Sequence, residues 1–215
     1  MDVRMFTVGL VQENCFLLRR DDAQSALIVD PGDEAPRILK AVEELGVTVE
    51  AILVTHCHFD HVGAVAPVAK ATGAPVWVSE IERPVLADIM SYVPFAGFGP
   101  FESYEADHTL KGGERLELAG FEIDVLFTPG HSPGHLTYSI ADEQAIFSGD
   151  VLFQGSVGRV DLPGGDWETL LGSIGGLVDS LSEETTVYPG HMGITSLGAE
   201  RRTNPFLAEL AAGGS

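Results

Sequence analysis

Three histidines and a carboxylate follow directly after a short apolar run, and no other feature of the chain restricts its fold as much. The run Ala51–Val54 is typical of a buried strand, and the cluster occupies Thr55–His61 immediately after it. Imidazole nitrogens and carboxylate oxygens are the ligands that zinc and similar metals prefer. In extended backbone, side chains two residues apart point the same way, so His56 and His58 are placed to bind one ion together.

Asp60 and His61 complete the cluster and, after a bend in the chain, are placed to serve a second ion. Four ligands from one loop do not complete two ions, so further ligands must come from elsewhere in the fold. His131, Asp150 and His191 are the candidates, because each follows an apolar run in a turn that contains glycine. With these three residues the ligands suffice for two ions, and Asp150 is placed to bridge them.

Three strand-like runs end in the same small motif, in which proline precedes glycine. The motif closes the segments Val29–Gly32, Phe127–His131 and Val187–His191. Proline removes a hydrogen-bond donor and glycine permits an unusual turn, so each motif ends a strand and redirects the chain. The repetition predicts two halves of similar build, with functional loops gathered at one end of the strands.

Short apolar runs alternate with helical patterns along the whole chain, which predicts an α/β fold. The predicted strands are Ala26–Val29, Ala51–Val54, Val76–Val78, Phe121–Phe127, Leu136–Ile140 and Ala145–Phe147. The predicted helices are Glu34–Leu45, Val65–Thr72, Ile81–Met90, Trp167–Leu181 and Ala199–Leu210. Neither a flexible linker nor a block of charge divides the sequence, so we expect residues 1–215 to form a single domain.

Composition excludes several classes of function. The chain carries 12 Lys and Arg against 32 Asp and Glu, a formal net charge of −20, and so acidic a surface repels a phosphate backbone. Cys15 and Cys57 are too few for a disulfide framework, and Met1–Leu10 lacks the pattern of a secretory signal. Apolar runs are too short to cross a bilayer. We therefore expect a cytoplasmic protein that binds neither nucleic acid nor membrane.

The pattern His-x-His-x-Asp-His, followed at a distance by His, Asp and His, resembles the metallo-β-lactamase superfamily of metal hydrolases. Three segments resemble its glyoxalase II-like (hydroxyacylglutathione hydrolase) branch, in the short form without a helical C-terminal domain: Ser148–Phe153, Gly155–Gly165 and Glu200–Phe206. This resemblance implies a four-layer αββα sandwich, with the metals at one edge between the two sheets.

The resemblance also implies a role for each ligand. The implied set is His56, His58 and His131 on the first ion, Asp60, His61 and His191 on the second, and Asp150 between the two. Zinc is the expected metal, and iron or manganese also suits these ligands. His135 is expected to support the ligands or the local structure, and His108 to lie at the surface.

Two divalent ions about 3.5–4 Å apart hold a hydroxide that attacks an ester-like carbonyl. Asp60 is expected to orient that nucleophile or take its proton, and Asp150 to hold the ions in place. A thiolate is a good leaving group, since a thiol has a pKa of about 8.5, so a thioester needs little help from an acid. We therefore predict hydrolysis of an S-acyl thiol, with S-lactoylglutathione as the model substrate.

Four residues are candidate substrate contacts: Phe95, Phe98, Arg159 and Arg201. The two phenylalanines belong to the aromatic segment Tyr92–Tyr104, which is either a loop held by aromatic anchors or a hydrophobic lid over the site. The arginines either attract an anionic substrate or form ion pairs with nearby carboxylates such as Asp161 and Glu200.

Three alternatives remain open. A persulfide dioxygenase of the same superfamily uses one iron, which His56, His131 and Asp150 would hold here, although Ser156–Gly158 stands where that group usually has Gly-Cys-Gly. A lactonase would use the same two-metal hydroxide. A metal-binding scaffold without catalysis is the third, and the intact ligand set argues against it.

Overall fold

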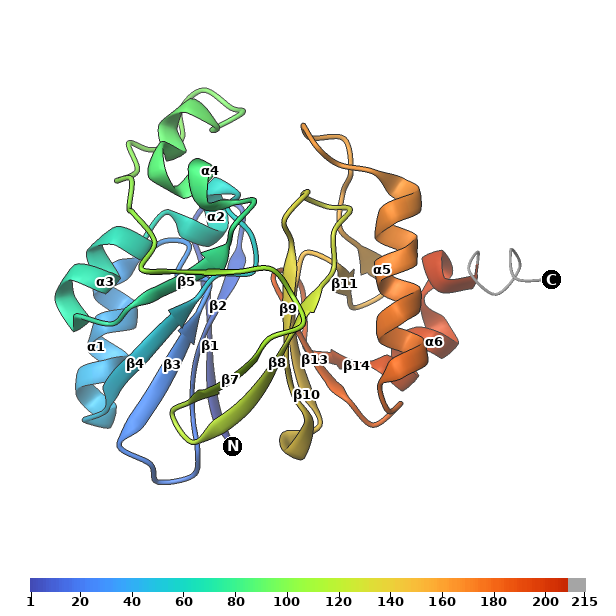
Figure 1. Ribbon diagram of the computed structural model, residues 1–215, viewed down its shortest axis with the longest axis horizontal. Coiled ribbons are helices and arrows are strands. Elements are labelled where there is room, and N and C mark those ends of the chain that lie inside the picture. Colours follow the sequence, from blue (N-terminus) through green and yellow to red (C-terminus); the bar gives the residue numbers. More distant parts are fainter. Residues whose placement is uncertain (209–215) are drawn as a thin grey trace.

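The computed structural model describes residues 1–208. Two six-stranded sheets face one another, and helices cover the outer face of each, so the chain forms four layers in the order α, β, β, α (Figure 1). This arrangement confirms the predicted sandwich. No helix within residues 1–208 is long and apolar enough to cross a membrane.

The first sheet has its strands in chain order. They are β1 (Asp2–Val8), β2 (Glu13–Arg19), β3 (Ser25–Val29), β4 (Thr48–Leu53), β5 (Val76–Ser79) and β6 (His108–Leu110). The helical segments on this side are α1 (Ala35–Leu45), α2 (Phe59–Val62), α3 (Val65–Thr72), α4 (Arg83–Ala87) and η1 (Ile89–Ser91). Strands β3 to β6 are parallel, so their carboxyl ends meet at one edge of the sheet.

The second sheet has the order β14-β13-β10-β9-β8-β7. Its strands are β7 (Arg115–Leu118), β8 (Phe121–Phe127), β9 (Leu136–Ile140), β10 (Ala145–Gly149), β13 (Thr186–Pro189) and β14 (Thr195–Ser196). The remaining elements are η2 (Ala141–Glu143), the ribbon strands β11 (Leu152–Phe153) and β12 (Ser156–Val157), and the helices α5 (Trp167–Ser180) and α6 (Leu197–Thr203).

Three apolar cores separate the four layers. The middle core lies between the sheets, where Phe16 of β2 meets Phe147 of β10 edge to face with ring centroids 5.3 Å apart. A second core joins the first sheet to its helices through residues such as Ile38, and a third joins the second sheet to α5 through residues such as Ile174. The two sheets are thus fixed against each other along their length, and loops from both meet at one edge.

Two glycines let the loops at that edge approach closely. A Cβ on Gly32, which ends the first Pro-Gly motif, would lie 1.6 Å from the carbonyl oxygen of Asp60. A Cβ on Gly158 would lie 1.9 Å from the carbonyl oxygen of Asp150. No side chain fits at either place, so glycine at these two positions allows the polar loops to pack directly against neighbouring backbone.

The observed elements differ from the predicted ones in places. The predicted helix Ile81–Met90 is divided into α4 and η1, because the backbone leaves the helical region at Asp88, with φ −144° and ψ 53°. The predicted helix Ala199–Leu210 begins two residues earlier as α6, and its last two residues lie outside the described part of the chain. Strands β1 and β2 were not predicted; the burial they show depends on pairing with β3 and packing on the second sheet.

Candidate metal centre

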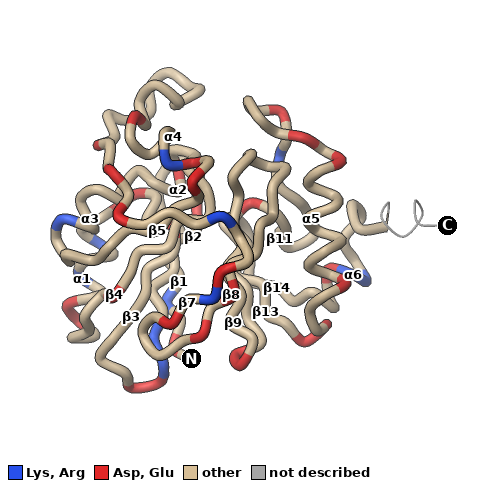
Figure 2. Tube along the Cα trace, viewed as in Figure 1, with Lys and Arg blue, Asp and Glu red and all other residues tan. Residues whose placement is uncertain are grey.

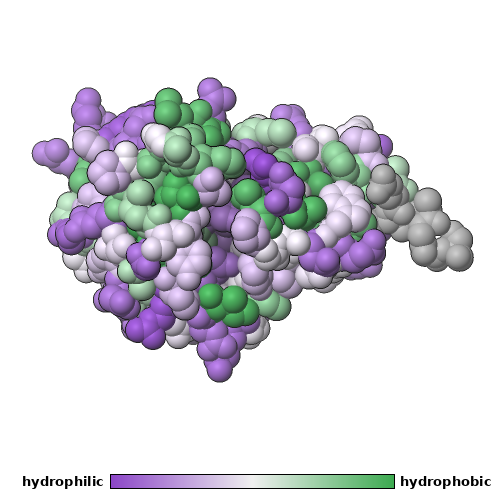
Figure 3. Space-filling view, turned by 90° about the horizontal axis from the view of Figure 1, so that it is seen from above, coloured by the Kyte–Doolittle hydropathy of each residue, from purple (hydrophilic) through white to green (hydrophobic). Residues whose placement is uncertain are grey.

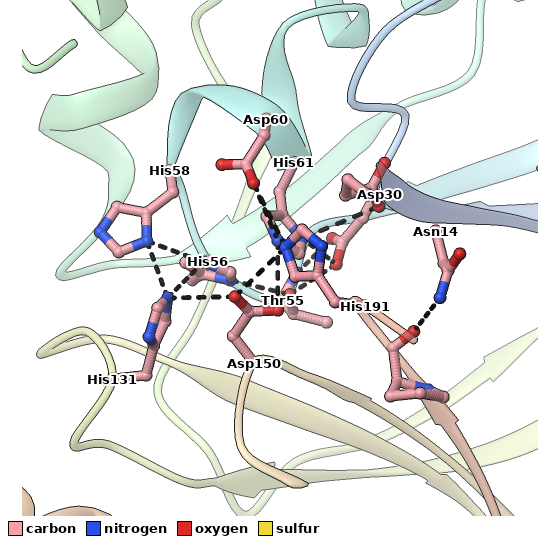
Figure 4. A network of polar contacts seen from close by, with 12 residues as sticks. Asn14, Asp30, Thr55, His56, His58, Asp60, His61, His131, Asp150 and His191 are labelled. Atoms are coloured by element: carbon pink, nitrogen blue, oxygen red, sulfur yellow. Dashed lines mark hydrogen bonds and ion pairs between the residues drawn. The ribbon is translucent and has the colours of Figure 1, made fainter. Parts of the chain in front are cut away.

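Four loops bring the seven predicted ligands to the edge between the sheets. The loop after β4 carries His56 and His58 and continues into α2, whose first turn holds Asp60 and His61. The second sheet supplies the other three ligands from the loops after β8, β10 and β13: His131, Asp150 and His191. Figure 4 shows these side chains pointing toward one another from the two sides.

One group consists of three imidazoles. His56 Nε2 lies 3.0 Å from His58 Nδ1, His58 Nδ1 lies 2.8 Å from His131 Nε2, and the third side of the triangle is 3.1 Å. Three nitrogens around a tetrahedral zinc, each 2.0–2.1 Å from the ion, would be about 3.3 Å apart. The triangle therefore has nearly the size that a zinc ion requires.

A second group lies beside the first. His191 Nε2 is 3.3 Å from Asp60 Oδ2, and His61 Nε2 is 3.9 Å from the same oxygen. The donor atoms of these three residues all lie within 4.8 Å of one another. Two imidazoles and a carboxylate thus face a common point.

Asp150 contacts both groups. Its Oδ2 is 3.4 Å from His131 Nε2 and 3.5 Å from His191 Nε2, while its Oδ1 is 3.3 Å from His61 Nε2. The side chain is almost buried. A single carboxylate therefore lies between the three-histidine group and the mixed group, which is the position that sequence reasoning gave it.

Hydrogen bonds behind the ligands fix their orientation. His61 Nδ1 lies 3.0 Å from Asp30 Oδ2, and Asp30 also accepts hydrogen bonds from the backbone nitrogen and hydroxyl of Thr55 at 2.7 and 2.6 Å. The backbone nitrogen of Asp150 donates to His135 Nε2 at 3.0 Å. This contact gives His135 the supporting role that was expected, and His108 is exposed at the surface, as expected.

Glu82 is a supporting residue that sequence reasoning missed. Its buried carboxylate accepts hydrogen bonds from the Cys57 backbone nitrogen, the Ser132 hydroxyl and the Gly134 backbone nitrogen, at 3.2, 2.8 and 2.9 Å. It therefore joins the loop of His56 and His58 to the loop of His131. Its partners lie 25 to 52 residues away in the chain, so no local pattern could have revealed them.

Glu13 is a second buried carboxyl that was missed. It is fully buried on β2, and neither oxygen has a hydrogen-bond partner among the described residues. His61 Nδ1 lies 3.8 Å from its Oε1. Burial raises the pKa of Glu13 well above its usual range, although the nearby His61 acts in the opposite direction.

Burial and neighbouring charges shift the pKa values of the histidines and aspartates at the site. Burial, together with neighbouring imidazoles, lowers the pKa of His56 well below its ordinary value and that of His58 to about 4. Burial acts in the same direction on His61, but Asp150 and Asp60 outweigh it and raise the pKa of His61. Burial disfavours ionised Asp150, but three nearby histidines hold its pKa well below the usual range. The lowered pKa values of His56 and His58 favour the imidazole form that binds metal, and the carboxylate of Asp150 beside them attracts a cation.

The residues fit a pair of metal ions on further grounds. His61 Nε2 and Asp150 Oδ1 are buried and have no hydrogen-bond partner among residues 1–208. Unpaired buried polar atoms are costly, and a cation between them would satisfy both. The donors are the imidazole and carboxylate groups that zinc, iron and manganese accept.

The acidic chain offers few cations near this centre (Figure 2). A cavity of about 270 Å³ opens over the metal centre, and within residues 1–208 Arg159 is the one arginine or lysine that lines it. Its guanidinium forms two hydrogen bonds to Asp161, both at 2.6 Å, so the pairing with Asp161 that we considered is present. Arg201 does not reach this cavity and instead contacts Glu183 at 3.5 Å and Asp179 at 4.0 Å.

The aromatic segment Tyr92–Tyr104 lies beside the centre. Phe95 lines the cavity over the metal centre, whereas Phe98 packs on Phe59 with ring centroids 4.7 Å apart and lines a neighbouring cavity. Phe101 also stacks on Phe59 at 5.8 Å. Aromatic anchoring is therefore present in this segment, and of its two predicted substrate contacts only Phe95 faces the site.

Comparison with known proteins agrees with this geometry. The sequence pattern of the metallo-beta-lactamase superfamily matches residues 8–191. The chain belongs to this superfamily. It is 37% identical to a hydroxyacylglutathione hydrolase GloC of Haemophilus influenzae, a match that spans 96% of this chain and 98% of that protein.

Two solved structures extend the comparison within the superfamily. The BLEG-1 B3 metallo-beta-lactamase is 39% identical and superimposes with a TM-score of 0.91, over 96% of this chain and 99% of that one. TTHA1623 in a di-iron-bound form is 40% identical, with a TM-score of 0.78 over 95% of this chain and 100% of that one. The chain is thus a metallo-hydrolase of this superfamily, with clusters of histidine and aspartate suited to metal binding.

Proposed function

We propose that the protein is a thioesterase that hydrolyses S-acylated thiols of the glutathione type, with S-lactoylglutathione as the model substrate. It would use two divalent metal ions, and zinc is the metal we expect. The position of Asp150 carries this proposal, because its two oxygens lie within 3.5 Å of nitrogens from both ligand groups. The likeness to GloC, a hydroxyacylglutathione hydrolase, supports the choice of substrate.

Each ion would have its own ligands. The first would bind His56, His58 and His131, the second would bind Asp60, His61 and His191, and Asp150 would bind both. Bound there, two ions would supply a water of lowered pKa and polarise a carbonyl oxygen.

Asp60 is the carboxylate best placed to handle a proton. It lines the open cavity, and part of its side chain is exposed to it. Burial opposes its ionisation, but His61 outweighs that effect and lowers the pKa of Asp60 below its ordinary value. The carboxylate can therefore orient a water as a hydrogen-bond acceptor, while the leaving thiolate needs no acid.

Metal content and substrate hydrolysis test the proposal together. We expect the purified protein to hold about two metal ions per chain and to cleave S-lactoylglutathione. Asp150→Ala should lose metal and reduce kcat/KM by about 10³-fold, which corresponds to about 4 kcal/mol of transition-state stabilisation. Asp33→Ala changes an exposed aspartate near the site and is the matched control.

A panel of substrates separates the proposal from other chemistry of the superfamily. The metal-loaded enzyme is assayed on S-lactoylglutathione, a lactone and a cephalosporin under the same conditions. Cleavage of the lactone or the cephalosporin without the thioester would refute the proposed function, as would full activity after complete removal of metal.

A further inference from the structure

A second cavity adjoins the one over the metal centre. It has a volume of about 390 Å³ and shares His58, Pro94 and Leu162 with the metal-side cavity, so the two spaces meet at His58. His58 turns Nδ1 toward His56 and His131, and its ring forms part of the wall of the second cavity. The ring of His58 therefore borders both cavities.

The second cavity is lined chiefly by apolar side chains. They include Ile81, Val85, Tyr92, Val93, Leu162 and Pro163. Ile81 and Tyr92 are about half exposed, at 49% and 54%, although isoleucine and tyrosine both carry large apolar surfaces. Seen from this end of the molecule, hydrophobic residues gather on the surface beside hydrophilic ones (Figure 3). Exposed apolar groups that line a hollow next to a reaction centre are typical of a binding site.

The lining carries no free charge to attract an anion. Among residues 1–208, Glu82 is the one carboxylate of this lining, and it is 4% exposed and takes part in the three hydrogen bonds that join the ligand loops. No lysine or arginine of the described part of the chain lines this cavity. Moving an unpaired charge from water into such a space is costly, whereas burying methylenes is favourable.

The metal-side cavity has the opposite character. It contains Arg159, whose exposed guanidinium can turn from Asp161 toward a substrate carboxylate. The carboxylates of a glutathione-type thiol therefore fit the Arg159 side of the metals. With the thiol on that side, the acyl group would extend from the scissile carbonyl in the other direction, toward His58 and the apolar cavity.

We propose that the cavity between His58 and Ile81 binds the acyl chain of the thioester, and that the enzyme prefers apolar acyl groups of several carbons to short hydroxyacyl groups. This inference rests on the proposed thioesterase function. It assigns specificity to Ile81 and Val85 around the start of α4, to the segment around Tyr92 and to the loop before α5, none of which belongs to the ligand set.

A series of glutathione thioesters tests the preference, because the thiol is constant while the acyl group varies. The metal-loaded enzyme is assayed on S-lactoyl-, S-acetyl-, S-butyryl- and S-hexanoylglutathione. We expect kcat/KM to rise by up to about fourfold for each methylene that enters the cavity, so that the hexanoyl ester exceeds the acetyl ester by more than tenfold.

Two changes at the cavity mouth locate the effect. Ile81→Glu places a charge there and Ile81→Trp narrows it, so each should reduce kcat/KM for the hexanoyl ester at least tenfold and leave that for the lactoyl ester within about twofold. Ile194→Glu is the matched control, since Ile194 is 43% exposed and lines neither cavity. Unchanged lactoyl activity shows that the variants remain folded.

The outcomes distinguish this inference from the proposed function. Cleavage of S-lactoylglutathione with a flat response to acyl length, or an acyl preference that both Ile81 variants retain, would overturn the inference and leave the thioesterase function standing. If no thioester of the series is cleaved, the proposed function itself is wrong, and the acyl site falls with it.

Discussion

Buried carboxylates behind the histidines orient the metal-binding atoms of the site. Asp30, which is 2% exposed, lies opposite Nδ1 of His61 and so directs Nε2 of that ring toward Asp150. It also accepts two hydrogen bonds from Thr55, the residue before His56. Such contacts hold the ligand rings before any ion binds, which lowers the cost of metal binding.

Replacing Asp30 with asparagine should weaken the ion held by His61. Loss of the carboxylate charge leaves the His61 N–H less well held, and changes of this kind typically reduce metal affinity 10- to 100-fold. The affinity is measured by competition with a chromophoric chelator, on Asp30→Asn and on Asp33→Asn as the control. Equal affinities in the two variants would show that Asp30 does not position His61.

Residue types and spacing were enough to predict which side chains gather at the site. His56 and His58 closely follow an apolar run of the first sheet, and His131 closely follows one of the second sheet. The burial of Glu13 could not be predicted, because its surroundings come from Gly32, Asp30 and His61, all distant in sequence. A glutamate at the start of a strand is ordinarily exposed to solvent. Glu13 is buried because β2 packs against the site.

Among the elements, strands with a regular apolar pattern were predictable and those whose ends carry polar site residues were not. Strand β2 is buried at six of its seven residues, yet it begins with the polar residues Glu13 and Asn14, so its sequence does not show the apolar pattern of a buried strand. Asn14 donates hydrogen bonds to the carbonyl oxygens of Pro189 and Met192, and thereby joins β2 to the loop of His191. Tertiary contacts, not local preference, decide the burial of this strand.

The loops that carry the ligands are joined by Glu82, and its replacement should loosen them. In Glu82→Gln, the NH2 group of the new amide replaces one of the two carboxylate oxygens. It then faces groups that donate hydrogen bonds to Glu82, either the backbone nitrogen of Cys57 or the Ser132 hydroxyl and the Gly134 backbone nitrogen. An unsatisfied buried hydrogen-bonding group costs about 1–3 kcal/mol, so the free energy of unfolding should fall by that amount. Urea denaturation measures the change.

Glu80→Gln provides the control for Glu82, because the side chain of Glu80 is exposed and forms an ion pair with the exposed Lys111 at 3.5 Å. That surface pair should contribute less than about 1 kcal/mol. Indistinguishable stabilities of the two variants would mean that the buried hydrogen bonds of Glu82 do not hold the loops together.

At the scale of the molecule, the metal centre lies where two sheets of separate chain segments meet. His56, His58, Asp60 and His61 come from the first half, while His131, Asp150 and His191 come from the second. Below the site the halves are joined by the apolar core between the sheets, but at the edge they present carboxylates and imidazoles to one another. Two dications at this edge would offset four units of a formal net charge of −20, and they would hold the halves together.

Removal of metal should therefore lower the stability of the whole fold, and not of one loop alone. An ion present at about 1,000 times its dissociation constant stabilises the native state by about 4 kcal/mol, and in a chain of this length each kcal/mol shifts Tm by about 2–4 °C. Chelation followed by removal of the chelator should lower Tm, measured by calorimetry, by about 8–16 °C, and added zinc should restore it. Asp150→Ala, which lacks the bridging carboxylate, should begin near the lower value and respond little to chelation. If verified metal-free wild-type protein has an unchanged Tm, metal binding does not contribute to the stability of the fold, and the apolar core alone holds the two halves together.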